Sequence, residues 1–165
     1  MKQTINILLK SKRLDILRTK YDSPYKKVKT HITLVYPFEV ENQEKLVEHI
    51  EYSICGISQF KITLQKARRS GKHLVLDGAD SKNLLIDLYK KLNSGILAGF
   101  ENKELSIYLP HVTLGVFESN EEMNEALAKL REQNLSYLIE VDAINLLTLN
   151  SDDSVKEIKV FKLPK

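Results

Sequence analysis

The spacing of hydrophobic and polar positions divides the chain into short helices and strands. Helical spacing of apolar residues predicts four helices, at 12–21, 43–54, 82–93 and 120–132. Alternation and β-branched content predict strands at 4–9, 31–36, 58–67, 72–77, 111–117, 136–149 and 154–163, the second of these ending before Pro37. A residue able to cap a helix precedes each predicted helix: Ser11, Asn42, Asp80 or Ser81, and Ser119.

The order of these elements repeats once along the chain. A strand, a helix, a strand, a helix and two strands are followed by a second pass that starts at 72–77. This order predicts an α+β fold with two pseudo-symmetric lobes, each a largely antiparallel sheet backed by two helices, around a central cleft. Because no linker separates the two repeats near 70–80, we expect one bilobal domain over residues 1–165.

Composition narrows the class of protein only slightly. The 165 residues are 42% hydrophobic and 28% charged, which is typical of a soluble globular protein. The net charge of +3 permits a polyanionic ligand without requiring one. The single cysteine, Cys55, excludes an internal disulfide, and we expect it to be buried as a small apolar residue. Since no apolar run is long enough for a signal peptide or a membrane span, the sequence predicts a cytoplasmic protein.

A duplicated tetrapeptide is the feature that points to a specific chemistry. His31-Ile32-Thr33-Leu34 recurs as His111-Val112-Thr113-Leu114, eighty positions later. Only four histidines are present, and two of them are followed by Thr at the second and Leu at the third position. Because alternate residues of a strand share a face, each copy offers an imidazole and a hydroxyl on one face and an apolar anchor on the other. If the two lobes face each other, both polar faces line the central cleft.

Two imidazoles that face one substrate are suited to paired proton transfer. A histidine titrates near pH ~6.5, so that one ring can take a proton from an attacking oxygen while the other gives one to a leaving oxygen. The threonine hydroxyls can donate to the oxygens that carry charge in the transition state. A phosphodiester fits these groups, because it has two exchanging ester oxygens and non-bridging oxygens that accept hydrogen bonds.

The paired motifs, the second within Pro110-His111-Val112-Thr113-Leu114-Gly115, resemble those of the two-histidine (2H) phosphoesterase superfamily. Its bacterial LigT-like branch of 2'-5' RNA ligases and cyclic phosphodiesterases is the most similar in motif and element order. The resemblance implies metal-independent hydrolysis or opening of a 2',3'-cyclic phosphate or a 2'-5' phosphodiester in RNA or a small nucleotide, with no cofactor. It also implies that His31 and His111 are the general acid and base and that Thr33 and Thr113 hold the phosphate. Ligase-like members often carry a basic residue after the second motif, whereas 146–154 is acidic here, which favours hydrolysis or ring opening over ligation.

Further residues are weaker candidates for substrate contacts. Lys29, with Lys26 and Lys27, could meet an RNA backbone, the alternative being a solvated loop. Tyr36 could stack on a base, although its strand parity differs from that of Thr33, which favours packing. Arg68, Arg69 and Lys72 are interpreted as solvated turn charges, His49 as a boundary residue of a helix, and His73 as ambiguous. No metal-ligand spacing and no P-loop are present in the sequence, so we expect neither a metal site nor ATP-driven chemistry.

Two other functions remain open at this point. A non-catalytic RNA- or nucleotide-binding module could keep the cleft without turnover. The motifs could also be coincidental strands of a repeat protein. Intact imidazoles in both motifs favour the enzyme, since a binding module has no need of two titratable groups.

Overall fold

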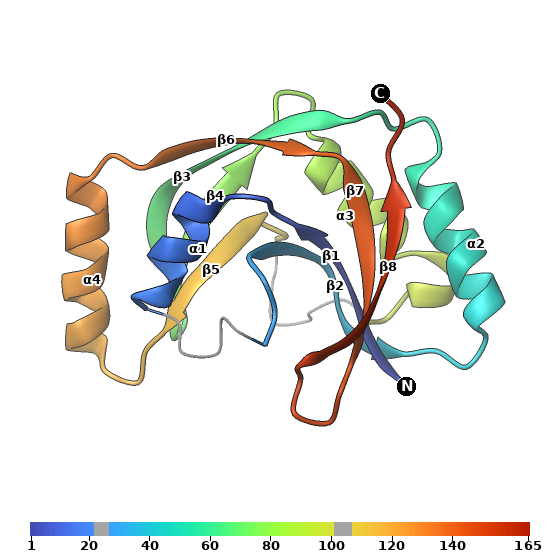
Figure 1. The fold of residues 1–165 in the computed structure, drawn as a ribbon, viewed down its shortest axis with the longest axis horizontal. Helices are drawn as coiled ribbons and strands as arrows, with labels where there is room; N and C mark the ends of the chain where they lie inside the picture. The colour runs from blue at the N-terminus through green and yellow to red at the C-terminus, as the bar shows by residue number, and fades with distance from the viewer. Residues whose placement is uncertain (22–26, 101–106) are drawn as a thin grey trace.

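The computed structural model describes residues 1–21, 27–100 and 107–165, and Figure 1 shows their arrangement. The helices and strands are, in order, β1 (Lys2–Leu8), α1 (Lys12–Thr19), β2 (His31–Glu39), α2 (Gln43–Ile54), β3 (Phe60–Ser70), β4 (His73–Ala79), α3 (Leu84–Leu92), a short 3₁₀ turn (Gly95–Leu97), β5 (His111–Val116), α4 (Asn120–Glu132), β6 (Ser136–Val141), β7 (Ala143–Leu149) and β8 (Val155–Lys162). The predicted α+β class and the repeated order of elements are confirmed.

The described strands form one curled antiparallel sheet in the order β6-β3-β4-β5-β2-β1-β7-β8. Two sets of four strands meet where β5 lies beside β2, and the one residue pair assigned there is Ile32 with Val112. The expectation of two separate sheets was therefore wrong in detail. Hydrophobic periodicity predicts which residues face a core, but it does not show that the two motif strands pair with each other.

The helices tie the two sets of strands together. Helix α1 follows β1 in the chain but packs against β5, and α3 follows β4 but packs against β2. Helix α4 covers β3, and α2 packs on α3, so that α1 and α4 lie at one end of the molecule and α2 and α3 at the other (Figure 1). The buried apolar side chains of sheet and helices form one continuous cluster.

The predicted caps explain where the helices begin. The side chains of Ser11, Asn42 and Ser119 accept hydrogen bonds from backbone N–H groups three residues later. Asp80 caps α3 from further away, because its carboxylate accepts from the N–H groups of Lys82, Leu84 and Leu85. All four helices thus have at least part of their first turn satisfied by a side chain that the sequence identified.

Two strand boundaries differ from the prediction. Residues 136–149 form two strands: the chain leaves β6 at one edge of the sheet, turns at Asp142 and enters β7 beside β1 at the other end. No Gly or Pro marks this crossing, which is why one continuous strand was predicted. Strand β2 also continues past Pro37 to Glu39. Proline has no backbone N–H to donate, and it is tolerated here because the register against β1 shifts at this position.

Two smaller findings concern Cys55 and membrane insertion. Cys55 is exposed at the end of α2, which contradicts its expected burial. The longest described helix, α4, has 13 residues, and none of the described helices has the length and apolarity of a membrane span.

Candidate active site

The two motifs lie side by side at the centre of the sheet. Ile32 and Val112 form the pair that joins β2 to β5, and both side chains are fully buried on the helix-covered face. Continued by one residue on either side, the antiparallel register of this pair sets His31 across from Thr113 and Thr33 across from His111. The four polar side chains are half-buried and project to the opposite face of the sheet.

A β-bulge falls at the leucine of each motif. Asn6 pairs with Thr33 but Ile5 pairs with Val35, so that Leu34 is an extra residue on β2. Strand β5 repeats this irregularity against β4, since Val75 pairs with Thr113 and Leu74 with Gly115, which leaves Leu114 as the extra residue. A bulge bends its strand and re-aims neighbouring side chains, and here it does so at equivalent positions in both motifs.

Both imidazoles are held by the same backbone contact. Nδ1 of His31 lies 2.7 Å from the carbonyl oxygen of Lys29, and Nδ1 of His111 lies 2.7 Å from that of Leu109. Because a carbonyl oxygen can only accept, Nδ1 carries the proton in each ring. Nε2 is therefore the nitrogen that gains or loses a proton, in the same orientation relative to each strand.

The surroundings of the two histidines differ across the sheet. Asp77 of β4 pairs with His111 and forms an ion pair with Arg68, whose Nε lies 2.7 Å from Oδ1. The residue that pairs with His31 from β1 is Leu8. Burial lowers the pKa of His111, Arg68 and the nearby His73 lower it further, and the Leu109 carbonyl and Asp77 oppose this shift.

Side chains from outside the motifs donate hydrogen bonds to the backbone of the first motif. Tyr108 donates its hydroxyl to the carbonyl oxygen of Thr33 at 2.8 Å, and its ring stacks on Tyr89 with centroids 3.8 Å apart. Nδ2 of Asn93 donates to the carbonyl oxygen of Leu34 at 2.8 Å. Burial raises the pKa of Tyr108 far above its usual range, so the hydroxyl stays protonated and remains a donor.

The residues that the sequence offered as weaker candidates for substrate contacts differ in how close they lie to the motifs. Lys29 is exposed and supplies the carbonyl that holds His31. Tyr36 is half-buried, and the bulge at Leu34 reverses the strand alternation, so that Tyr36 lies on the same side as Thr33 despite their different parity. Lys26 lies outside the described residues. His49 contacts the Leu92 carbonyl through Nε2 at 3.0 Å, away from the motifs.

Sequence reasoning missed three residues of this region. Arg68, interpreted as a solvated turn charge, lies within β3 and pairs with Asp77. Neither Asp77 nor Tyr108 belongs to a motif, and both reach the site through cross-strand or loop contacts. The nearest signal was the charge of Asp77 at an otherwise apolar strand, which alone does not indicate a partner. Among the described residues, no group of three His, Cys, Asp or Glu side chains is placed to hold a metal ion.

Comparison with known proteins places these features in a family. Residues 9–153 match the family model of the 2'-5' RNA ligase superfamily. A protein of Halalkalibacterium halodurans named as a phosphoesterase is 27% identical over 152 residues, which cover 90% of this chain and 87% of the relative. A Geobacillus protein with the same description is 28% identical over 134 residues, covering 79% and 76%.

Solved structures share the fold at low sequence identity. E. coli LigT in complex with 3'-AMP superposes with a TM-score of 0.61 at 17% identity, over 99% of this chain and 98% of LigT. Usb1 of Kluyveromyces marxianus with uridine monophosphate gives a TM-score of 0.56 at 10% identity, over 98% of both chains. With the family model matching most of its length, this chain belongs to the 2'-5' RNA ligase superfamily.

Proposed function

We propose that the chain is a phosphodiesterase that hydrolyses or opens a 2',3'-cyclic phosphate or a 2'-5' phosphodiester by paired-histidine general acid/base catalysis. The observation that carries this proposal is the matched hold on the two imidazoles, each with Nδ1 on the carbonyl two residues earlier. A histidine with a purely structural role needs a hydrogen bond that fixes its own ring and no matching partner ring. Two equivalent orientations on paired strands are what a proton acceptor and a proton donor on one phosphate require.

The reaction on a 2',3'-cyclic phosphate uses these groups in one step. A water oxygen attacks phosphorus while one Nε2 takes its proton, and the P–O bond to one ribose oxygen breaks as the other imidazole protonates that oxygen. The hydroxyls of Thr33 and Thr113 donate to the non-bridging oxygens, whose charge is largest in the transition state. The roles of His31 and His111 exchange when the reaction runs in reverse.

The similar proteins support a nucleotide substrate. LigT has been crystallised with 3'-AMP and Usb1 with uridine monophosphate, both nucleoside monophosphates. We propose that Tyr36 contacts the base or ribose, since it lies on the side of β2 that carries Thr33, and that Lys29 faces the substrate backbone. No metal takes part in the proposed steps, and the protein is proposed to act in the cytoplasm.

The deciding experiment is turnover of a nucleoside 2',3'-cyclic phosphate and of a 2'-5' dinucleotide in excess EDTA. We expect activity to persist in EDTA and kcat to fall by about 10²–10⁴-fold in His31→Ala and in His111→Ala. His49→Ala is the matched control, because this ring contacts a helix carbonyl outside the motifs. Full activity of either motif variant, or loss of activity with EDTA, would overturn the mechanism. Histidine-dependent binding with unchanged ligand would instead favour the non-catalytic binding module.

A further inference from the structure

A groove of about 610 Å³ lies along β1, β7 and β8, on the sheet face that carries His31 and Thr33. Its lining comes from these strands, from the turn between β6 and β7, and from the residues after β8. The contributing residues are Leu8, Lys10, Gln59, Asp142, Ala143, Asn145, Ile158, Val160, Lys162, Leu163 and Lys165. The mechanism proposed above uses none of them.

Strand register connects this groove directly to the first motif. Thr33 pairs with Asn6, Asn6 with Asn145, and Asn145 with Val160, so these residues form one row across four strands on one face. In the next row His31 pairs with Leu8, and Ala143 pairs with Lys162. With neighbouring strands ~4.8 Å apart, the row from His31 reaches Lys162 after ~14 Å.

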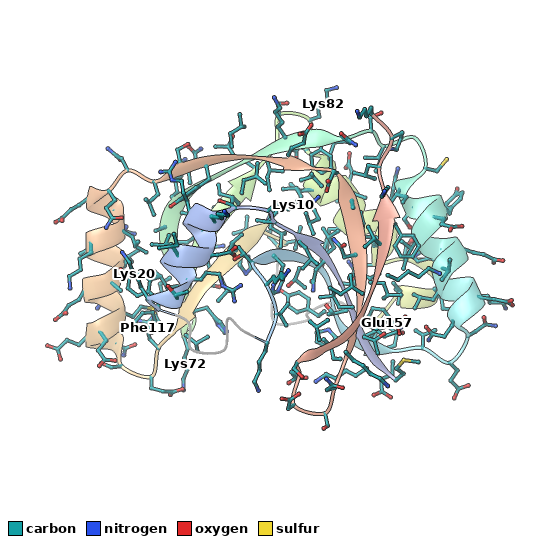
Figure 2. All side chains as sticks on the ribbon, viewed as in Figure 1. Lys10, Lys20, Lys72, Lys82, Phe117 and Glu157 are labelled. Carbon is teal, nitrogen blue, oxygen red and sulfur yellow. The ribbon has the colours of Figure 1, made fainter. Side chains whose placement is uncertain are left out.

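The groove combines an apolar floor with a cationic rim. Ile158 and Val160 are 42% and 51% exposed, although they lie on an edge strand where exposed apolar side chains favour unwanted association. The carboxylate of Asp142 is neutralised by Lys10, whose Nζ lies 2.5 Å from Oδ2. Figure 2 shows Lys10 between α1 and β7. Within the described part of the chain, no carboxylate lies within ion-pair distance of Lys162 or Lys165.

We propose that this groove binds a nucleotide of a single-stranded oligonucleotide that lies beyond the one adjoining the scissile phosphodiester, with its phosphate at Lys162 and its base or ribose over Ile158 and Val160. The inference rests on the proposed function, because the catalytic phosphate fixes where the strand begins. A phosphate held by His31 is ~14 Å from the strand that carries Lys162, so one phosphate does not reach both. An apolar floor with a cationic rim suits a ligand with flat faces and a repeating negative charge.

The occupant follows from this pattern of charge. An acidic peptide would also meet Lys162, but it would not place the reacting phosphate of the same molecule at His31. A mononucleotide would occupy the motif site alone. We therefore expect an oligonucleotide to bind more tightly and to react faster than a mononucleotide.

The test compares a nucleoside 2',3'-cyclic phosphate with a tetranucleotide that ends in the same cyclic phosphate, using the full chain. We expect kcat/KM to be higher for the tetranucleotide, and the ratio of the two values to fall about tenfold in Lys162→Ala, as for one lost charge-assisted contact. Val160→Glu should lower the ratio as well, because it places a carboxylate on the floor. Lys159→Ala is the control, since this lysine has the same charge on the same strand but pairs with Leu146 on the other face.

A binding measurement separates this inference from the proposed function. Anisotropy of a labelled tetranucleotide 3'-phosphate, titrated with the His31→Ala protein, reports the groove without turnover. Removing Lys162 should reduce the slope of log Kd against log salt by ~0.7, the value for one single-strand phosphate contact. The proposed binding in the groove would be contradicted by three results. These are a wild-type ratio of the two kcat/KM values near one, the same ratio in Lys162→Ala as in the wild type, or an unchanged salt slope in Lys162→Ala. Full turnover in the histidine variants would overturn the proposed function and leave the binding result standing.

Discussion

In both His31 and His111, Nδ1 contacts the carbonyl oxygen two residues earlier, but the neighbours of the two rings across the sheet differ. Leu8 lies opposite the first ring, whereas Asp77 and its partner Arg68 lie beside the second. The two rings are therefore distinguishable at the residue scale, even though the duplicated motif makes them equivalent in the sequence. The charges of Asp77 and Arg68 allow the protonation state of His111 to be adjusted.

We predict that His111 titrates below the ordinary histidine value of ~6.5, because its burial and the Arg68 cation disfavour the imidazolium. Asp77→Asn should lower the pKa of His111 further, since the carboxylate favours the charged ring. Arg68→Gln should raise it. NMR titration of the ring protons, assigned with a His111→Gln variant, measures both shifts. Shifts of the same sign in the two variants would contradict this account of the ion pair.

The sequence identified the motif residues but not the pair that modulates them. His31, Thr33 and their repeats could be predicted because alternation along one strand fixes which side chains share a face. Arg68 and Asp77 reach His111 through pairing between β3, β4 and β5, and a local pattern carries no information on strand partners. The bulge at Leu34, which brings Tyr36 to the face that carries Thr33, likewise cannot be predicted without the partner strand.

At the scale of elements, helices were predicted more accurately than strands. Capping residues mark helix starts locally, and the side chains of Ser11, Asn42, Asp80 and Ser119 all cap as expected. Strand ends depend on the sheet around them, as the division of 136–149 at Asp142 shows.

The cap of α3 is expected to contribute measurably to stability. Asp80→Ala removes an acceptor shared by three backbone N–H groups, and we expect the free energy of unfolding to fall by about 1–2 kcal/mol. Asp87→Ala is the control, because this exposed carboxylate lies in the same first turn and caps no backbone group in the described contacts. Urea unfolding followed by circular dichroism measures both. Equal losses in the two variants would indicate a general charge effect instead of a cap.

The glycine after the second motif permits the close approach of α1 to β5. A Cβ on Gly115 would lie 2.4 Å from the carbonyl oxygen of Tyr21, which is backbone and cannot rotate away. We expect Gly115→Ala to destabilise the fold by about 1–3 kcal/mol and to lower activity, because β5 carries His111. Gly78→Ala is the matched control, since its Cβ would meet side-chain ends of Leu64 and Ile32 at 3.1 and 3.3 Å and would lie at an ordinary contact distance of 3.7 Å from the Pro110 carbonyl oxygen. Thermal unfolding and kcat of both variants decide the point.

The whole molecule joins two similar halves at the place where the proposed chemistry occurs. The repeated order of elements predicted the two halves, but not that α1 of the first covers β5 of the second while α3 covers β2. This exchange of helices is why the two halves share one sheet and one buried cluster. Only one residue pair, Ile32 with Val112, is assigned between the motif strands, so a ligand at this position can bridge the halves.

An anion bound between the motifs should therefore stabilise the entire fold. Inorganic phosphate at 100 times its Kd is expected to add about 2.7 kcal/mol to the free energy of unfolding, or roughly 5–10 °C in Tm. At a pH where the rings are protonated, His31→Ala and His111→Ala should each lose most of this increment, because each removes an imidazolium whose Nε2–H donates to the anion. Calorimetry with chloride at matched ionic strength, and with His49→Ala as the control variant, isolates the specific effect.

An equal phosphate effect in all variants would place the bound anion elsewhere. If instead both motif variants lose it while His49→Ala keeps it, the anion must contact His31 and His111 together, since a ligand held by one half alone would lose its effect in only one of them. That result would also separate the enzyme from the coincidental repeat, because two unrelated amphipathic strands give no reason for both histidines to bind one anion. The phosphate titration thus examines the bipartite site before any substrate is known.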